Sequence, residues 1–410
     1  MNRMLHDRTY LFNIKGVNII GNGENGAIIG LDAAGIDFIN RIKKEGLIEE
    51  STLNNEEKQI MAALNELGYF KNDTGILKNA YLHVTDRCNL TCVGCYSFIE
   101  DRNIQKDLST AQLKHIVDQL ADCGVEKLVI SGGEPFIRDD MADILAHIKK
   151  HNIGVAVITN GTMDWDRVEK AIPFIDSLSV SVDGYNRETR FIRNEGIMDK
   201  VLDFVEHFKN LVHVHLIFTL HKKNVEYMRN YIRLAEGLKV SFNFSIFTVD
   251  PHDKTFSDFI LEDNDIYEIA KVINEGDNVY IEDSVINGNS DGVEGLCCKV
   301  GCGLGCKMVS IAANGEVYPC HMLHKEAMKM GDIKMDSLKN ILKSKESIWS
   351  HMTVDNVKGC NTCDYKYMCG GGCRGRSYLY DNVIDHKDPF CILTKLYLEQ
   401  RTKVFEHLAK

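Results

Sequence analysis

The sequence has no long hydrophobic run and no apolar segment at its start. No stretch of about 18 consecutive apolar residues occurs, so we expect no transmembrane helix. The opening residues, MNRMLHDRTYLF, do not contain the apolar core of a secretory signal peptide. We therefore expect a cytoplasmic protein that has no membrane partner.

The sequence also lacks an excess of basic residues. It has 48 lysines and arginines against 59 aspartates and glutamates, which gives a formal net charge of −11 at pH 7. A general nucleic-acid binder would carry a basic patch. This balance argues against nucleic acid as a partner.

Cysteine, in contrast, is abundant, with 14 among 410 residues. Disulfides are rare in the cytoplasm, so clustered cysteines indicate a metal or catalytic site. The first cluster lacks a fourth member, because CNLTCVGCY supplies Cys88, Cys92 and Cys95 and the next cysteine is Cys123. We expect Cys123, at a helix end, to be a small buried residue.

Residues 1–77 have the pattern of a small separate unit. Alternating apolar residues predict strands at TYLFNI, GVNII and AIIGL. Asp32 is a candidate N-cap for a helix that stops at Gly46, and a second helix ends at Gly68. Together with about three short helices, these strands predict a winged-helix-like domain.

The turn GNGENG, Gly21 to Gly26, matches the dinucleotide-binding motif G-x-G-x-x-G. That motif must open a helix after a strand, whereas the strand-like AIIGL comes next here. We therefore interpret the stretch as a hairpin turn in which glycines supply positive φ.

Residues 78–250 alternate between strand-like and helix-like segments. Six apolar runs are typical of buried parallel strands: YLHVT, KLVIS, GVAVIT, SLSVSV, HVHLIFTL and SFNFSIFTV. This alternation predicts an α/β protein with a partial (β/α)6 barrel of the TIM type, whose ligands bind at the C-terminal ends of the strands. The stretches CNLTCVGC, GGEP and TNGT each follow such a strand, so they should face one cavity.

The remainder of the chain divides into two parts. Residues 251–296 are acidic, and we expect them to connect the barrel to a separate C-terminal region. Residues 297–410 hold most of the remaining cysteines and predict a cysteine-rich domain.

The three-cysteine loop after the first barrel strand points to a metal with an open position. A structural zinc site and an electron-transfer [4Fe–4S] cluster both take four ligands. Three thiolates on a four-iron cube leave one iron free, as a catalytic metal requires. A zinc-binding loop is the alternative.

The spacing Cys88-x3-Cys92-x2-Cys95, followed by Tyr96, resembles the motif of the radical S-adenosylmethionine (SAM) enzymes. The resemblance implies that these cysteines hold a [4Fe–4S] cluster whose open iron binds SAM. GGEP, SVSVDG and TRFIRN resemble other SAM-binding stretches of the family, in which an arginine often holds the SAM carboxylate. The implied SAM-binding residues are Tyr96, Gly132, Gly133, Glu134, Asn160, Ser181, Asp183 and Arg193.

The later cysteines resemble those of the SPASM domain, which carries two auxiliary [4Fe–4S] clusters. The resemblance implies an outer cluster on Cys360, Cys363, Cys369 and Cys391 and an inner cluster on Cys302, Cys320 and Cys373. The expected cofactors are therefore SAM and three [4Fe–4S] clusters. Out of this context, the paired cysteines would also fit zinc.

Two features near the inner cluster have more than one interpretation. Cys297, Cys298 and Cys306 are candidates for its fourth ligand, of which we favour Cys298, and an open iron is the alternative. His321 follows Cys320 at a position where related sulfatase-maturing enzymes have a proton-accepting aspartate. We expect His321 to be a general base, or else to hydrogen-bond to a cluster or the backbone.

The resemblance implies an enzyme in which a 5′-deoxyadenosyl radical abstracts hydrogen from its substrate. The unit at 1–77 resembles the recognition element of maturases for ribosomally made peptides, which binds a precursor's leader as an added strand. We therefore expect a precursor peptide as substrate and an external electron donor such as flavodoxin or ferredoxin.

We expect the bond formed to be a cysteine thioether. Carbon–carbon linkage, epimerisation and a sulfatase-maturing type of reaction are the alternatives. A third hypothesis, of a different class, is a catalytically silent iron–sulfur or zinc scaffold. DNA binding by a winged helix is disfavoured, because IDFINRIKKEG has few basic residues and EESTLNNEE is acidic.

Overall fold

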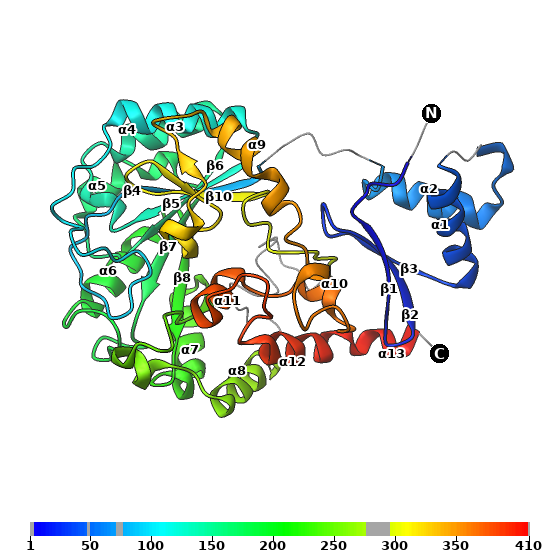
Figure 1. Ribbon diagram of the computed structural model, residues 1–410. Helices are drawn as coiled ribbons and strands as arrows, with labels where there is room; N and C mark the ends of the chain where they lie inside the picture. Colours follow the sequence, from blue (N-terminus) through cyan, green and yellow to red (C-terminus); the bar gives the residue numbers. More distant parts are fainter. Residues whose placement is uncertain (1–3, 47–49, 71–76, 276–295, 409–410) are drawn as a thin grey trace.

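The computed structural model describes residues 4–46, 50–70, 77–275 and 296–408 (Figure 1). An N-terminal unit of strands and helices lies beside a large sheet that helices surround, and short helices of the C-terminal region lie between the two. Among the described residues, no helix combines the length and apolar character needed to cross a bilayer.

The N-terminal unit is an antiparallel sheet followed by two α-helices. Its strands are β1 (Thr9–Ile14), β2 (Val17–Asn22) and β3 (Ile28–Leu31), in the order β1-β2-β3. Helix α1 (Ala33–Glu45) begins where the Asp32 carboxylate accepts a hydrogen bond from the Gly35 N–H, and it ends at Gly46 with φ of 66°. Helix α2 (Asn55–Glu66) follows a single 3-10 turn at Glu50–Thr52.

The predicted strands, the Asp32 cap and the stop at Gly46 are confirmed. GNGENG is also confirmed as a hairpin turn, since it joins two strands instead of opening a helix. About three short helices were predicted, and the described residues form two α-helices and one 3-10 turn. Residues 1–3, 47–49 and 71–76 of the predicted unit lie outside the described part of the chain.

Six parallel strands form the partial barrel in the order of the sequence. They are β4 (Asn79–Thr85), β5 (Lys127–Gly132), β6 (Gly154–Thr159), β7 (Ser177–Val182), β8 (His213–Leu220) and β9 (Ser241–Ile246). All six predicted strands are therefore confirmed, and the α/β barrel with them. Because neighbouring strands run parallel, their C-terminal ends meet at one edge, where the predicted motifs lie.

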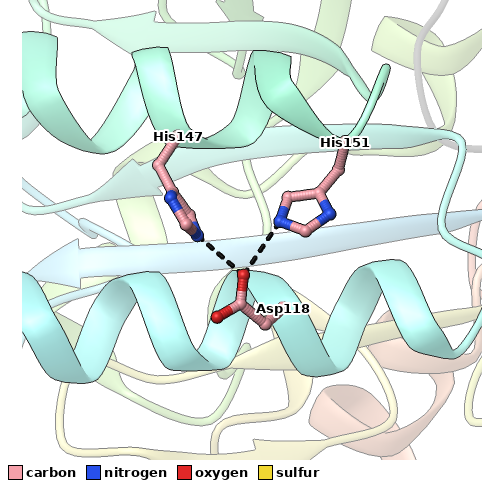
Figure 2. A group of neighbouring side chains, drawn as sticks. All are labelled: Asp118, His147 and His151. Atoms are coloured by element: carbon pink, nitrogen blue, oxygen red, sulfur yellow. Dashed lines mark hydrogen bonds and ion pairs between the residues drawn. The ribbon is translucent and has the colours of Figure 1, made fainter.

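Five helices cover the outside of this sheet (Figure 1). They are α3 (Thr110–Asp122), α4 (Met141–Lys150), α5 (Trp165–Glu169), α6 (Met198–Phe208) and α7 (Met228–Leu238). Helix α5 is short, because Pro173 has no N–H to continue it and a 3-10 turn follows instead. Helices α3 and α4 lie side by side and carry a group of polar side chains between them (Figure 2).

The cysteine-rich region extends the barrel sheet. Strand β10 (Met308–Ile311) pairs in parallel with β4, and β11 (Glu316–Tyr318) and β12 (Gly331–Asp332) add antiparallel strands, which gives a nine-stranded sheet. Helices α9 (Leu338–Trp349), α10 (Lys366–Cys369), α11 (Arg374–Asp381), α12 (Cys391–Arg401) and α13 (Phe405–Leu408) come after these strands. Within the predicted connecting region, α8 (Asp263–Glu275) packs on α12, and residues 276–295 lie outside the described chain.

The N-terminal sheet is packed onto this C-terminal region. Ile14 and Ile19 form an apolar cluster with Met368 and Leu398, and each of these side chains is 1% exposed. The ring of Tyr10 on β1 lies 4.6 Å from that of Tyr367, between centroids. The members of this cluster come from both ends of the chain. Burial of their apolar surface therefore holds the N-terminal unit against α10 and α12.

Candidate active site and cluster-binding cysteines

Three thiols lie close together in the loop that follows β4. Cys88, Cys92 and Cys95 are free and half-buried. Burial raises the pKa of Cys88 and of Cys92, and the charge of the neighbouring thiols raises both values further. The loop therefore gathers three sulfur atoms, as the spacing predicted.

A nitrogen donor stands near each of these thiols. Each donor atom lies 3.9 Å from a sulfur: Asn160 from Cys88, Arg193 from Cys92 and Arg102 from Cys95. The donors come from three different segments of the chain. Donors and positive charge around a thiolate stabilise its anionic form, so the surroundings suit metal-bound sulfur.

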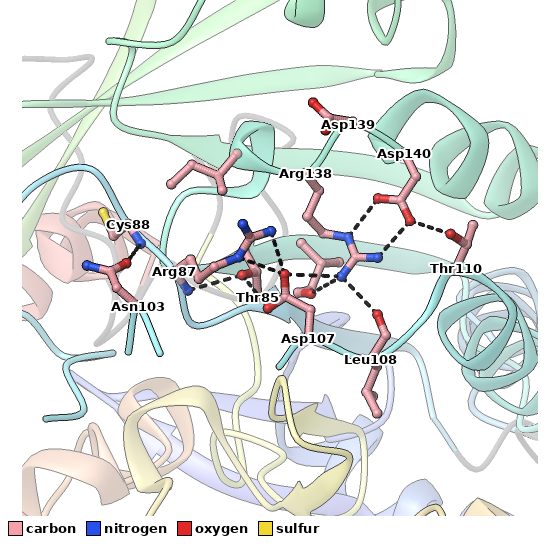
Figure 3. A network of polar contacts seen from close by, with 12 residues as sticks. Thr85, Arg87, Cys88, Asn103, Asp107, Leu108, Thr110, Arg138, Asp139 and Asp140 are labelled. Atoms are coloured by element: carbon pink, nitrogen blue, oxygen red, sulfur yellow. Dashed lines mark hydrogen bonds and ion pairs between the residues drawn. The ribbon is translucent and has the colours of Figure 1, made fainter. Parts of the chain in front are cut away.

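A carboxylate ties the two ends of the cysteine loop together (Figure 3). Asp107 accepts hydrogen bonds from Thr85 Oγ1 at 2.6 Å and from Arg87 Nε and Nη2 at 2.9 and 2.7 Å. The nearly buried Arg138 lies 3.6 Å from the same carboxylate and pairs with Asp140 at 2.7 Å. These bonds fix the path of the loop and hence the place of its cysteines.

The glycines of GGEP pass directly against the cysteine loop. A Cβ on Gly132 would lie 2.2 Å from the Thr85 carbonyl oxygen, and one on Gly133 would lie 2.0 Å from that of Arg87. Gly132 also has φ of +125°, which disfavours any other residue. The two glycines therefore allow β5 to end beside the three thiols.

Glu134 links the ends of β5 and β6. Its fully buried carboxylate accepts hydrogen bonds from Thr159 Oγ1 and the Asn160 N–H, both at 2.8 Å, and from the Phe136 N–H at 3.2 Å. Burial raises the pKa of Glu134 to about 7, although these bonds favour the charged form. Glu134 thereby holds Asn160 where its side chain approaches Cys88.

Asp183 positions the segment that carries Arg193. Its carboxylate accepts hydrogen bonds from the backbone N–H groups of Phe191, Ile192 and Arg193, at 2.6, 3.0 and 3.1 Å. The carboxylate of Asp183 is therefore occupied by backbone groups of its own chain. Ser181, two residues earlier on β7, is half-buried, and the predictions that Ser181 and Asp183 contact SAM remain predictions.

His321 lies on the inner side of the barrel sheet, next to the aromatic residue of the cysteine motif. Its ring stacks on that of Tyr81 at 4.1 Å and meets the ring of Tyr96 edge-on at 5.6 Å. The Tyr96 hydroxyl in turn lies 2.8 Å from Ser131 Oγ. Burial lowers the pKa of His321 to about 4, so the imidazole is neutral at pH 7 and its protonated form is disfavoured. The role of His321 as a general base remains a prediction.

Two further histidines, which the sequence interpretation did not include, complete this group. The ring of His83 lies 4.6 Å from that of His324, and His324 Nε2 lies 2.8 Å from Ser310 Oγ. Burial lowers the pKa of both, to about 3 for His324. Tyr81 and His83 alternate along β4 and so share one face, and this polar pattern in a buried strand could have identified His83. No sequence pattern indicates His324.

The four cysteines predicted to hold the outer cluster line one cavity. Cys360, Cys363, Cys369 and Cys391 surround it together with Gly371, Gly372 and Asp388. Four thiols around one space are the donor set that a [4Fe–4S] cluster takes.

The cysteines predicted for the inner cluster come from segments that touch. The Gly305 N–H donates to the Pro319 carbonyl at 3.0 Å, which brings the turn after Cys302 next to Cys320. The 3-10 turn at His321–Leu323 packs on the start of α11, which Cys373 caps. The structure therefore brings these three backbone segments together.

The structure separates two of the candidates for the fourth inner ligand. Cys298 is 3% exposed and faces the N-terminal sheet, since a Cβ on Gly21 would lie 2.6 Å from its sulfur. Burial raises its pKa to about 12, and Cys297 adds to the shift. Cys306 lies in the turn that begins at Gly303, directly after Cys302. Burial raises the pKa of Cys306, and the Cys302 thiol adds a smaller contribution.

Two family profiles match the regions that hold these cysteines. The radical SAM superfamily profile matches residues 82–235, and the profile of the SPASM iron–sulfur cluster-binding domain matches residues 302–364. The chain contains a radical SAM domain followed by a SPASM domain. This radical SAM enzyme thus has its cysteine loop, glycine motif and Asp183 in the first matched region and the C-terminal cysteines in or near the second.

Several relatives are similar over most of the chain. Mycofactocin maturase MftC of Mycolicibacterium smegmatis is 25% identical, over 75% of this chain and 81% of its own. The AdoMet-dependent heme synthase of Methanosarcina barkeri is 27% identical, over 75% and 94%. PqqA peptide cyclase of Granulibacter bethesdensis is 24% identical, over 76% and 86%.

Two solved structures share the fold. Native anSMEcpe with bound AdoMet has a TM-score of 0.65 at 18% identity and covers 81% of this chain and 99% of its own. Streptococcus suis SuiB bound to the precursor peptide SuiA has a TM-score of 0.60 at 15% identity and covers 95% and 99%.

The residues of this radical SAM enzyme fit the cofactors of its superfamily. Cys88, Cys92 and Cys95 offer three thiols in one loop, each with a nitrogen donor nearby, and this donor set fits a [4Fe–4S] cluster. Arg193, beside the loop, offers a cation that fits the SAM carboxylate. The C-terminal cysteines fit further iron–sulfur clusters, as the matched domain implies.

Proposed function

We propose that this enzyme modifies a ribosomally made precursor peptide, and that the leader of the peptide binds at the edge of the N-terminal sheet. The observation that carries the proposal is an edge strand available for pairing. Strand β3 pairs with β2, and within the described residues no other backbone partner is found for Ile28–Leu31. An extended peptide can add to such an edge through main-chain hydrogen bonds.

The opposite edge of the sheet is less available. Lys43 Nζ donates to the Thr9 carbonyl of β1 at 3.1 Å, and Tyr10 packs on Tyr367 of the C-terminal region. The leader should therefore pair with β3. Because the sheet is fixed to the region that holds the C-terminal cysteines, a bound leader would keep the rest of the peptide near the barrel.

Three relatives support a peptide substrate. MftC is named as a maturase, the Granulibacter relative is named as a peptide cyclase, and SuiB was solved with its precursor peptide. SuiB also covers 95% of this chain, against 81% for anSMEcpe, so its similarity extends over more of the chain.

A porphyrin is the competing class of substrate. The heme synthase is as similar to this chain as the peptide-modifying relatives are. A porphyrin would have no use for the edge of β3, so variants at that edge would leave such a reaction unchanged.

The residues of the site then have separate roles. When bound, the cluster and SAM supply a 5′-deoxyadenosyl radical, which takes a hydrogen atom from a C–H bond of the substrate. Arg193 orients the SAM carboxylate, and Asp183 holds Arg193 in place. Glu134 fixes Asn160 beside the loop, and His321, next to Tyr96, would be the general base if binding of the substrate raises its lowered pKa.

We further propose that the product is a cysteine thioether, and auxiliary clusters, when bound, would offer an acceptor for the one electron left after loss of a hydrogen atom and a proton. Cys360, Cys363, Cys369 and Cys391 would hold the outer of these, which gives three clusters in all. Formation of a thioether removes the thiol hydrogen and one carbon-bound hydrogen. A carbon–carbon link would leave the thiols reactive, and an epimer would keep the mass unchanged.

The experiment that tests leader binding starts from any short open reading frame found beside the gene for this chain, whose encoded peptide is then synthesised. Synthetic versions carry an N-methyl group at one leader position at a time, which removes one backbone donor. Strand addition predicts that affinity falls at every second position, because alternate N–H groups face β3. Equal effects at neighbouring positions, or no effect at any, would contradict strand addition, and free peptide without measurable binding would contradict the substrate class.

A further inference from the structure

Two histidines lie one turn apart on the outside of the barrel. His147 and His151 occupy positions i and i+4 of the segment that forms α4 and its C-cap, so they project from the same face. Their side chains are 20% and 31% exposed. Solvent therefore reaches both, but neither points freely into it.

A carboxylate of the neighbouring helix meets both imidazoles (Figure 2). Asp118 of α3 places its Oδ1 atom 2.7 Å from His147 Nε2 and 2.8 Å from His151 Nε2. The three potential ligand atoms all lie within 4.8 Å of one another. Burial acts to raise the pKa of Asp118, but hydrogen bonds from the two histidines outweigh it and hold the carboxylate ionised.

We propose that Asp118, His147 and His151 form a binding site for a divalent transition-metal ion of the zinc type. Two imidazole nitrogens and one carboxylate oxygen are ligands that Zn²⁺ takes, and three protein ligands leave a fourth position for water. The exposed side of the group gives an ion access. Nothing in the proposed radical reaction uses these residues, which lie on outer helices.

The ion would join α3 to α4 more firmly at a point where Asp118 hydrogen bonds and side-chain packing already link them. Near the start of both helices, Thr110 Oγ1 donates to Asp140 of the neighbouring turn. The metal group lies further along both helices, towards their C-terminal ends. A bound ion would therefore act as a second tie and stabilise this side of the barrel.

A pure hydrogen-bond arrangement is the alternative, in which each Nε2–H donates to Asp118. The chain contains a matched example of such a bond: His207 Nε2 lies 2.7 Å from Glu169 Oε1, and no metal-ligand group of three forms there among the described residues. His207→Gln is therefore the control variant. Glutamine can donate the same hydrogen bond but binds zinc poorly, so H147Q/H151Q separates the two accounts.

The experiment measures zinc on the anaerobically reconstituted holoenzyme by equilibrium dialysis against Zn²⁺. The wild type and His207→Gln should bind one zinc ion more than H147Q/H151Q, and the affinity should fall by more than about tenfold for each histidine lost. X-ray absorption at the zinc edge should show nitrogen and oxygen neighbours for that ion. Sulfur neighbours alone would place the zinc on the cysteines and overturn the proposal.

Thermal unfolding gives a readout that does not depend on activity. Zinc should raise the apparent Tm of the wild type and of His207→Gln, because an ion that binds the folded state stabilises it, and should not raise that of H147Q/H151Q. Equal zinc binding and equal Tm shifts in all three proteins would overturn the site, as would an absence of binding to the wild type.

Discussion

The guanidinium of Arg376 and the carboxylate of Asp388 form an ion pair at 2.7 Å, with side chains only 1% and 3% exposed. Asp388 also accepts hydrogen bonds from the backbone N–H groups of Cys373, at 2.6 Å, and Phe390, at 2.8 Å. It therefore fixes one cysteine proposed for the inner cluster and the residue before Cys391, proposed for the outer one. A single buried carboxylate thus fixes the position of the segment that carries Cys373 relative to the segment that carries Cys391.

Replacement of the Asp388 carboxylate should destabilise the C-terminal region that holds the auxiliary sites. Asp388→Asn leaves the buried Arg376 charge without its partner, which should cost about 3–5 kcal/mol. We expect loss of iron from the auxiliary sites and a lower apparent Tm, measured anaerobically after reconstitution. Asp199→Asn removes a carboxylate from an exposed pair with Arg187 and is the control, in which iron content and Tm should stay unchanged. Full iron content in Asp388→Asn would refute this role.

Glu134→Gln should weaken SAM binding. The amide keeps the shape of the side chain, but its NH2 group would face the N–H of Asn160 or the hydroxyl of Thr159. A buried donor left unsatisfied costs about 1–3 kcal/mol, so the affinity for SAM should fall roughly 5- to 100-fold. Equilibrium binding of SAM to the reconstituted protein measures this. Unchanged affinity would show that Glu134 does not organise the SAM site.

The fourth ligand of the inner cluster can be identified from iron content. Cys298 lies against Gly21 of the N-terminal sheet, whereas Cys306 lies in the turn directly after Cys302. We expect Cys306→Ala to lower the iron content by up to about four atoms per chain and Cys298→Ala to leave it unchanged. The opposite result would favour Cys298, as the sequence pattern favours, and equal iron in both variants would favour an iron without a fourth cysteine.

Buried neutral histidines should make the fold sensitive to acid. Burial lowers the pKa of His321 to about 4 and that of His324 to about 3, from an ordinary value of 6.5. Between these limits the unfolded chain binds more protons than the folded one, so stability should fall as pH decreases below about 6.5. Each such histidine adds at most about 1.4 kcal/mol per pH unit to the slope.

His324→Gln tests this relation, since it removes one titrating group. The slope of the unfolding free energy between about pH 5 and 6 should be shallower by about one proton than in the wild type. Identical slopes in the wild type and His324→Gln would show that the acid sensitivity has another origin.

Much of the barrel could be predicted because its elements depend on local sequence. Apolar runs of strand length, separated by amphipathic helices, placed β4 to β9, and glycines that no other residue could replace marked the GGEP crossing. Asp32 and Gly46 bounded α1 through capping, which acts over a few residues. The thiols of Cys88, Cys92 and Cys95 came together because one short loop carries them.

Contacts between distant segments could not be predicted in the same way. The packing of Ile14 and Ile19 on Met368 and Leu398 leaves no periodic pattern that identifies the partner. The pairing of β10 with β4 joins strands far apart in sequence, and only this pairing brings His324 to His83. The role of Asp183 could not be predicted either. Its hydrogen-bond partners are backbone N–H groups, which every residue except proline has, so no residue type in the sequence marks them.

The central claim, radical chemistry on a precursor peptide, is tested most directly by the transfer of hydrogen. The reconstituted enzyme is incubated anaerobically with SAM, dithionite and the neighbour-encoded peptide, deuterated on carbon. We predict 5′-deoxyadenosine that carries deuterium, in equal amount to modified peptide, and neither product from the variant in which Cys88, Cys92 and Cys95 are alanine. 5′-Deoxyadenosine without deuterium beside an unchanged peptide, together with turnover of an iron porphyrin, would contradict the account.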